Sequence, residues 1–147
     1  MNGKSFIFLF LGGVVVFTAA LFYFQNYAYY ELKDIRQNFL LGNKRYEISN
    51  YQGIDSESSA LKLRECFVID SLDDIRLSKY ETPTPLTAPF WFKCFNAERI
   101  TKDLLDGKAS AFLLKKEEFD GIDNVIAVYP DGKSYRWRQL NSKYTEE

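Results

Sequence analysis

The first pattern along the chain is an uninterrupted apolar run near its N-terminus. No charged residue lies between Ser5 and Gln25. As a helix, Phe6–Phe24 would rise about 28 Å, close to the hydrocarbon thickness of a bilayer. The run has no polar stripe at helical spacing, which the core helix of a soluble protein would need. We therefore predict a transmembrane helix over residues 6–24.

A cleaved secretory signal is the alternative reading of this run. Thr18-Ala19-Ala20 resembles a cleavage site, but bulky residues continue through Leu21–Phe24, which favours an uncleaved signal anchor. Lys4 and the terminal amine give residues 1–5 a positive charge with no acid. This predicts that residues 1–5 are a short cytoplasmic tail and that the C-terminal domain lies outside the cytoplasm.

Three tyrosines follow the apolar run at helical spacing. Tyr23, Tyr27 and Tyr30 would share one helical face where a bilayer meets water, and tyrosine is enriched at that depth. We predict that they contact the membrane interface.

Residues 25–58 are polar and weakly patterned, which predicts a continuation of the helix, or a stalk, leading into the domain. Residues 59–141 would form that domain. Leu61–Ile69 alternates like a strand. Ser71, followed by Asp73 and Asp74, predicts the start of a short helix that ends by Ser78.

The middle of the domain combines a proline-rich loop with a capped helix. Prolines at 83, 85 and 89 exclude regular helix from residues 80–92 and favour an extended or turning backbone. Asn96 can cap a helix over residues 97–106, and Gly107 can end it.

The last third of the domain predicts a meander of strands over residues 109–116, 124–129 and 134–140, with a tight turn at Pro130–Lys133. In the last strand one face should pack and the other should be mostly solvated; the packed face holds Tyr135, Trp137 and Gln139, and the solvated face Arg136, Arg138 and Leu140. The fold class is α+β: an N-terminal transmembrane helix, then an antiparallel sheet with one or two helices. Residues 142–147 should fray.

Composition excludes several functions. The chain has 19 basic and 20 acidic residues, and all of them except Lys4 lie after residue 25, so the domain has no basic field for nucleic acid. It has no histidine, which excludes Ser-His-Asp and Cys-His catalysis, histidine-bound zinc or haem, and phosphohistidine relays. No glycine-rich phosphate loop is present, which argues against nucleotide binding. We expect no cofactor.

The two cysteines, Cys66 and Cys94, are not a Cys-x-x-Cys redox motif. In an exported domain they favour a structural disulfide, and the alternative is a pair of reduced core cysteines.

Carboxylate pairs could support acid–base hydrolysis: Asp73–Asp74, Glu117–Glu118, and Asp120 with Asp123. Residues 120–124 could also surround a calcium ion, but they lack the alternating ligands and terminal Glu of a calcium loop, so a turn between strands is favoured.

Two segments could bind a partner. The proline-rich loop presents Phe90, Trp91 and Phe92 from a stiff support, as interaction hot spots do; alternatively, these rings close one end of the core. Arg136 and Arg138 flank Trp137 and resemble a basic and aromatic binding stripe, with a solvated face as the alternative.

Several motifs together resemble a family of small uncharacterised, membrane-anchored proteins of alphaproteobacteria. They are Tyr27-Ala-Tyr-Tyr30, Arg64-Glu-Cys-Phe67, Pro89-Phe-Trp-Phe-Lys-Cys-Phe95, Gly121–Gly132 and Tyr135-Arg-Trp137. Members are sometimes labelled histidine kinases, which the missing histidine and phosphate loop contradict. The resemblance implies a Gram-negative inner membrane and a periplasmic domain, and it implies no activity.

The leading hypothesis is therefore a non-enzymatic accessory or interaction protein, bound to the lipid bilayer and to a membrane or periplasmic protein partner. The alternatives are a periplasmic small-ligand sensor and a histidine-independent carboxylate hydrolase of the envelope.

Overall fold

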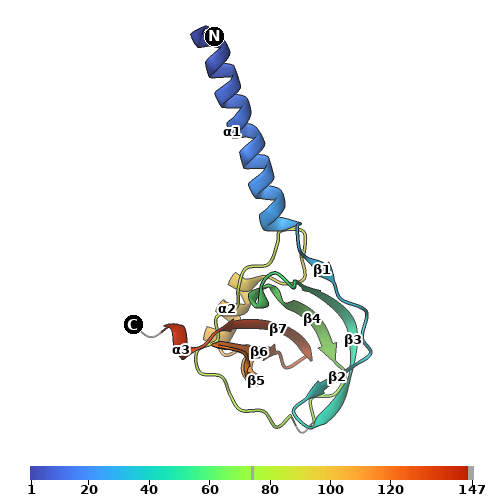
Figure 1. The fold of residues 1–147 in the computed structure, drawn as a ribbon. Coiled ribbons are helices and arrows are strands. Elements are labelled where there is room, and N and C mark those ends of the chain that lie inside the picture. The colour runs from blue at the N-terminus through green and yellow to red at the C-terminus, as the bar shows by residue number, and fades with distance from the viewer. Residues whose placement is uncertain (74, 146–147) are drawn as a thin grey trace.

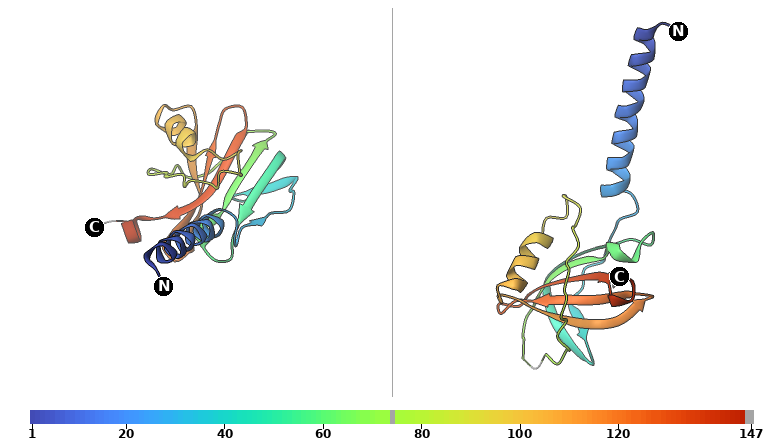
Figure 2. Two further views of the ribbon diagram at one scale, coloured as in Figure 1. Left: turned by 90° about the horizontal axis from the view of Figure 1, so that it is seen from above. Right: turned by 90° about the vertical axis from the view of Figure 1, so that its left-hand side faces the viewer.

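A long apolar helix stands on a small sheet domain in the computed structural model, which describes residues 1–73 and 75–145 (Figure 1). Helix α1 spans Gly3–Asn26, begins at Asn2, whose side chain accepts a hydrogen bond from the Ser5 amide, and buries none of its residues. It points away from the domain in both side views (Figures 1 and 2). The predicted helix is confirmed, and α1 is long and apolar enough to cross a membrane.

The domain is built on an antiparallel sheet in the order β1-β3-β4-β7-β6-β5, with β2 paired to β3. The strands are β1 (Glu31–Leu32), β2 (Asn38–Leu41), β3 (Lys44–Asp55), β4 (Arg64–Ile69), β5 (Ser110–Phe119), β6 (Ile122–Val128) and β7 (Lys133–Leu140). With two short α-helices beside it, the sheet confirms the α+β class.

The predictions for the last third of the domain are confirmed. Strands β5 to β7 lie where the pattern predicted them, and α2 (Ala97–Leu105) begins after Asn96, whose side chain accepts from the Arg99 amide. The strand predicted over Leu61–Ile69 is confirmed only from Arg64, because Ala60–Lys62 form a 3-10 helix, η1, whose Leu61 amide donates to the Ser59 side chain. The turn between β6 and β7 closes at Gly132, which has a φ of 92° and donates its N–H to the Tyr129 carbonyl at 3.0 Å.

The prediction of a stalk over residues 25–58 is wrong, because this segment contains β1, β2 and β3. The reason lies in β3, where Tyr46 and Ile48 are buried in alternation and the register then shifts between Ser49 and Gln52. Asn50 adopts a φ of 54° at this bulge, and the next buried ring is Tyr51. The inserted residue breaks the period of two that identifies a strand in a sequence.

The predicted helix over residues 71–78 is also wrong for the part that the structure describes, since residues 71–73 and 75–78 contain no helix; Asp74 lies outside the described residues. Leu72, Ile75 and Leu77 instead pack on the sheet. The Ser71 hydroxyl donates to the Asp73 carboxylate at 3.1 Å rather than capping a helix.

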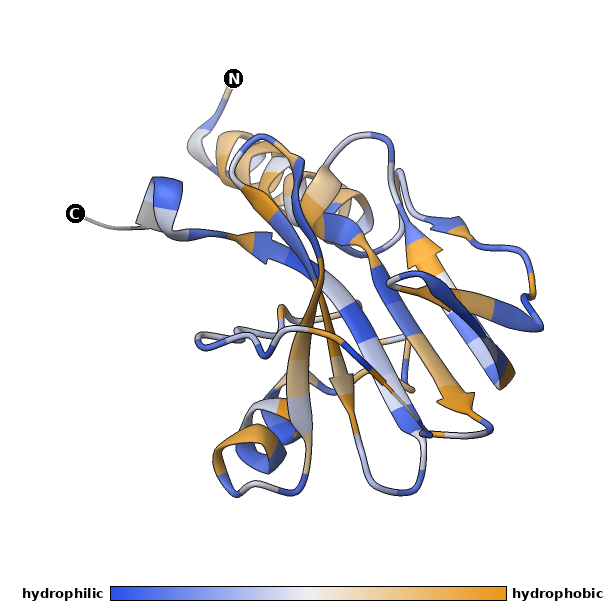
Figure 3. Ribbon diagram, turned by 90° about the horizontal axis from the view of Figure 1, so that it is seen from below, coloured by the Kyte–Doolittle hydropathy of each residue, from blue (hydrophilic) through white to orange (hydrophobic). Residues whose placement is uncertain are grey.

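The two faces of the sheet are covered differently. Helix α2 and the segment before it lie over one face, where Trp137 is fully buried among Phe92, Phe95 and Ile100 (Figure 2). The other face curls so that the β2–β3 hairpin covers Phe67 and the apolar end of β6. Figure 3 shows hydrophobic and hydrophilic colours following one another along the strands, whereas most connections are hydrophilic in colour.

The end of the chain is more ordered than predicted. Residues Ser142–Thr145 form α3, and the Tyr144 ring lies over Gly121, where an added Cβ would approach the ring to 2.1 Å. The Tyr144 hydroxyl donates to Asp120 at 2.5 Å. Fraying is thus wrong for residues 142–145, and residues 146–147 lie outside the described part of the chain.

Candidate functional site

The proline-rich segment before α2 is fixed to the sheet by a buried arginine. The Arg64 guanidinium donates to the carbonyls of Leu86 at 2.9 Å and Thr87 at 3.2 Å, and to those of Leu61 and Leu63 at 2.6 Å. Burial lowers the pKa of Arg64 to about 10, although Tyr30 and Asp55 oppose this, so the side chain stays cationic at neutral pH. A loop without regular structure is therefore held at two successive carbonyls.

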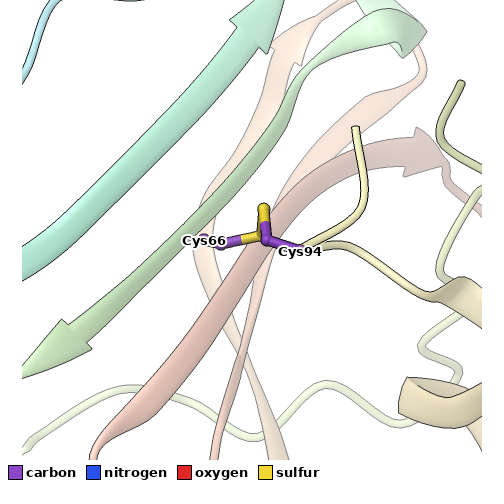
Figure 4. The surroundings of a disulfide bond; sticks show 2 residues. All are labelled: Cys66 and Cys94. Atoms are coloured by element: carbon purple, nitrogen blue, oxygen red, sulfur yellow. A yellow bond between two sulfur atoms is a disulfide. The ribbon is translucent and has the colours of Figure 1, made fainter. Parts of the chain in front are cut away.

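A disulfide adds a second attachment. Cys66 of β4 is bonded to Cys94, which lies just before α2, and their Cα atoms are 6.3 Å apart (Figure 4). The predicted disulfide is confirmed, and the alternative of two reduced cysteines is wrong.

Gln139 of β7 holds the start of the same loop. Its Oε1 accepts from the Thr84 amide at 2.7 Å and from the Trp137 indole at 2.9 Å, and its Nε2 donates to the Thr82 carbonyl at 3.0 Å. Side chains of the sheet thus order the loop. They form hydrogen bonds with loop backbone groups that have no partner in a strand.

The tip of the loop meets the end of α1. The Trp91 ring stacks on Tyr27 with centroids 6.1 Å apart and an interplanar angle of 8°, and its indole donates to the Asn26 carbonyl at the last residue of the helix. Phe90 stacks on Phe22 at 5.8 Å. The structure therefore joins the predicted interaction rings to the predicted interface tyrosines.

We call this group of side chains the aromatic cluster. It comprises Phe22, Tyr23, Tyr27, Tyr30, Phe90 and Trp91. The chain leaves the helix at Tyr27, which is its C-cap, and turns at Tyr29 with a φ of 67°. Tyr30 therefore does not continue the helical face that its spacing predicted, yet it meets the edge of the Trp91 ring at 5.9 Å.

The three predicted interaction rings have three different environments. Phe92 belongs to the core, as the alternative reading required, and Trp91 is half-buried between α1 and the domain. Phe90 keeps 58% of its surface exposed although it contacts two rings. Phe90 is thus not part of the core, and its uncovered side is continuous with the other exposed rings at the end of α1.

The predicted arginine stripe is not an exposed surface, and the prediction that this face of the last strand is solvated is wrong. Arg136 lies 3.1 Å from Glu65, whose side chain is fully buried and also contacts Lys33 at 2.8 Å. Arg138 is paired with Glu118 at 2.8 Å and with Asp55 at 3.3 Å. We call these six residues the charge network.

The sequence predictions missed the centre of this network. Glu65 is the one acid of β4, next to Arg64 and before four apolar residues, and that position was the available signal, because a buried acid needs a cationic partner. Burial and the neighbouring Glu65 raise the pKa of the Tyr51 hydroxyl, while Arg36 and Arg136 oppose that rise. The partner Lys33 comes from the segment just after α1.

The candidate acids serve as hydrogen-bond acceptors. Burial alone raises the pKa of Asp123, but the Glu117 amide, Asn141 and Tyr80 donate to it at 2.9, 3.1 and 2.9 Å and hold its pKa below the ordinary value. Likewise, burial raises the pKa of Glu118 and its hydrogen bonds with Arg138 outweigh this.

Two further groups of candidate acids are Asp120 and the Asp73–Asp74 pair. Asp120 accepts from Lys143 and Tyr144 at the turn between β5 and β6, which confirms the turn predicted there. Residue 74 of the Asp73–Asp74 pair lies outside the described residues. Across residues 1–73 and 75–145, no group of three or more potential metal ligands occurs.

A polar depression of about 410 Å³ lies beside α2. It is lined by two tyrosines, Tyr129 and Tyr135, and by charged side chains of both signs. The charged lining comprises Lys93, Arg99, Asp103, Lys108, Asp131 and Lys133. The Tyr129 hydroxyl donates to Asp103 at 2.6 Å across its wall.

Comparison with known proteins gives one result. A model described as a family of unknown function matches residues 39–147, which covers β2 to the end of the chain and begins after α1 and β1. Neither the curated proteins nor the solved structures contain a match.

Proposed function

The chain belongs to DUF6446, a family of unknown function, and from the structure we propose that it is a non-enzymatic, membrane-anchored interaction protein. In this proposal α1 is an uncleaved span of the inner membrane. The sheet domain lies in the periplasm and binds a membrane or periplasmic protein of the envelope.

The observation that carries the proposal is the firm attachment between α1 and the domain. The Trp91 indole binds the last carbonyl of the helix, and Lys33, seven residues beyond Asn26, reaches the buried Glu65. A domain on a flexible stalk would sample many orientations, whereas this one has a single orientation relative to its helix. A fixed domain at a membrane surface can present one face to a neighbouring membrane protein with little loss of entropy on binding.

Charge and redox chemistry support the proposed orientation of the protein in the membrane. Lys4 lies at the free end of α1 with no acid beside it, which favours the cytoplasm for that end. The Cys66–Cys94 disulfide favours an oxidising compartment for the other end, and the bacterial periplasm is one. Both arguments give the same orientation.

Reporter fusions and extraction test the anchor. Full-length protein should resist alkaline carbonate extraction, and a C-terminal alkaline phosphatase fusion should be active while a C-terminal fluorescent protein that folds only in the cytoplasm stays dark. Replacing Val15 and Val16 by Asp should release the protein from the membrane, because a charge at the centre of a span costs about 2.5 kcal/mol or more. Release of the unaltered protein by carbonate would overturn the anchor.

Crosslinking tests the interaction. Full-length protein, crosslinked in native membranes and purified in mild detergent, should carry a second protein in fixed proportion. The comparison is the same chain with Lys33→Gln and Trp91→Phe, which removes both attachments of the domain to α1, leaves Glu65 paired with Arg136, and should lower the yield of the crosslinked partner. Recovery of the unaltered protein solely as a free monomer would argue against an interaction role.

The depression beside α2 favours one second candidate, a sensor of a small anionic ligand. Four of its lining residues are basic and two are acidic, so its charge is net positive. A thermal shift with inorganic phosphate or citrate that is absent in Lys108→Gln would support this candidate. The hydrolase alternative stays a prediction.

A further inference from the structure

The exposed ring of Phe90 has a position that the core does not explain. Its centroid is 5.8 Å from that of Phe22, in a stacked arrangement, and 5.9 Å from that of Tyr27, edge-on. Phe22 lies inside α1, four residues before its end. At 1.5 Å per residue this is about 6 Å back along the helix axis, so Phe90 lies beside the helix rather than beyond it.

This geometry has a direct consequence if α1 spans a bilayer, as proposed above. Phe22 belongs to the apolar run that fills the hydrocarbon layer, so a ring stacked on Phe22 must lie at the same depth. No polar segment of α1 separates the two rings from the lipid, because the helix side chains around Phe22 are Leu21, Tyr23 and Phe24. The tip of the domain loop would thus reach the boundary between headgroups and hydrocarbon.

The exposure of the rings agrees with a lipid environment. Phe90 is 58% exposed, Phe22 51% and Tyr27 43%, so each has contact on one side and an uncovered surface on the other. Apolar ring surface in water costs about 25 cal/mol per Å², and the same surface at the membrane interface is favourable. The uncovered sides are contiguous with α1, whose own side chains are exposed along its length.

The loop holds this position without a membrane. The Phe92 amide donates to the Pro89 carbonyl at 2.9 Å and closes a turn around Phe90 and Trp91. Arg64 fixes the backbone at Leu86 and Thr87 on one side of the turn, and the disulfide fixes Cys94 on the other. A turn attached on both sides has little conformational entropy left to lose when lipid surrounds it.

A cation lies beside the tyrosines that follow α1. The Lys62 ammonium is 4.9 Å from the centroid of Tyr30 and 5.9 Å from that of Tyr29, both in the segment just after α1. A lysine beside rings just beyond the end of a membrane span can direct its charge to lipid phosphates while its methylenes cover the rings.

We propose that the turn of residues 89–92 is a second membrane contact of this protein: Phe90 lies among the acyl chains nearest the headgroups, with Trp91 at headgroup level, in the same bilayer that α1 spans. The two contacts, α1 and the turn, fix the tilt of the sheet domain on the membrane. The inference rests on the proposed membrane span.

Tryptophan quenching by brominated lipids tests the inference on the full-length protein. The chain has two tryptophans, and Trp137 is fully buried in the domain, so Trp91 is the one that lipid can reach. In vesicles of phosphatidylcholine and phosphatidylglycerol, bromines near the headgroup end of the acyl chains should cause a larger loss of emission than bromines near the bilayer centre. Trp91→Phe should abolish the loss, because only Trp137 remains.

A matched pair of variants then tests Phe90 itself. Phe90→Asp should reduce the quenching of Trp91, because a carboxylate is unfavourable among acyl chains and the domain tilts away from the lipid together with its attached turn, whereas Leu105→Asp, at an exposed apolar position on α2, should leave it unchanged. Circular dichroism of both variants should match that of the unaltered protein, since neither position belongs to the core.

The outcomes separate this inference from the proposed function. Carbonate-resistant protein whose Trp91 emission is insensitive to bromine at every depth would overturn the second contact and leave the anchor intact. Release by carbonate would overturn the anchor itself. A photo-crosslinking amino acid at position 90 that yields a discrete protein adduct in native membranes, rather than lipid adducts, would also overturn the lipid contact.

Discussion

The Lys33 ammonium lies 2.8 Å from an oxygen of Glu65, a carboxylate that is fully buried between β3 and β7. Arg136 contacts the same oxygen at 3.1 Å. Lys33 belongs to the short segment between α1 and the large strands, so this ion pair joins the end of the helix to the centre of the sheet. Its position explains why the segment after α1 is an ordered part of the domain.

Replacing Glu65 should therefore destabilise the domain strongly. Glu65→Gln leaves Arg136 and Lys33 partly buried without their counter-charge, and breaking a buried pair on one side costs about 3 to 5 kcal/mol. Urea unfolding of the full-length protein in detergent, followed by circular dichroism, measures the loss.

Arg99→Gln is the matched control for this prediction. It breaks an ion pair with Asp103 at 3.9 Å in which Arg99 is 78% exposed, and exposed pairs contribute less than about 1 kcal/mol. Equal effects of the two substitutions would show that Glu65 is not the central contact of the charge network.

The contrast between β3 and β7 shows what the sequence could predict. In β7, Tyr135 and Trp137 alternate in the sequence with Arg136 and Arg138, so a strand with Trp137 on its packed face could be predicted from a period of two, although both faces are buried around Trp137. Strand β3 alternates up to Ile48 and then shifts phase at Asn50, so its pattern resembles neither a strand nor a helix. A bulge depends on the partner strand, which no local pattern reveals.

The site was predictable in part for a similar reason. The stiff loop with its three aromatic residues and the tyrosines after α1 were each identifiable from the sequence, because prolines and aromatic rings have strong local preferences. Their contact was not, since Trp91 and Asn26 are 65 residues apart and meet only in the folded chain. The burial of Arg136 and Arg138 escaped prediction because the curl of the sheet covers a face that would be solvated on a flat one.

The disulfide should contribute more stability than any single hydrogen bond of the loop. It closes a loop between Cys66 and Cys94, which are 28 residues apart, and the chain-entropy model gives about 3.5 kcal/mol for a loop of this size. Reduction by dithiothreitol should lower the Tm of the unaltered protein to that of Cys66→Ala/Cys94→Ala. A Tm of the double variant that itself falls on adding dithiothreitol would show that the reagent acts elsewhere.

Acid should lower the folding stability of the domain by protonating Asp123. Burial raises the pKa of this carboxyl, but the Glu117 amide, Asn141 and Tyr80 together hold it below its ordinary value. Since the folded pKa is below the unfolded one of about 3.9, the contribution is complete above that pH and is lost as pH falls through the folded pKa. Asp123→Asn should therefore lower the Tm at pH 7, and the difference should shrink as the pH falls below 3.9.

Asp106→Asn removes a negative charge from an exposed position at the end of α2 and serves as the control. Melting curves of the two variants and the unaltered protein, recorded from neutral to acidic pH, give the comparison. A difference for Asp123→Asn that stays constant through this range would contradict the assignment of the carboxylate as the stabilising form.

Alanine substitutions at two glycines distinguish destabilisation by backbone strain from destabilisation by a steric clash. Gly107 and Gly132 have φ values of 75° and 92°, which favour glycine, but an added Cβ meets open space at Gly107 and the Ile69 carbonyl oxygen at 2.4 Å at Gly132. Gly107→Ala should cost about 1 to 2 kcal/mol from the left-handed backbone alone. Gly132→Ala should cost more, because it also pushes the β6–β7 turn from β4, where the Ile69 amide donates to the Gly132 carbonyl at 2.8 Å. Hydrogen exchange at the Ile69 amide should become faster in Gly132→Ala and stay unchanged in Gly107→Ala. Equal exchange rates of this amide in the two variants would contradict a close contact between the turn and β4.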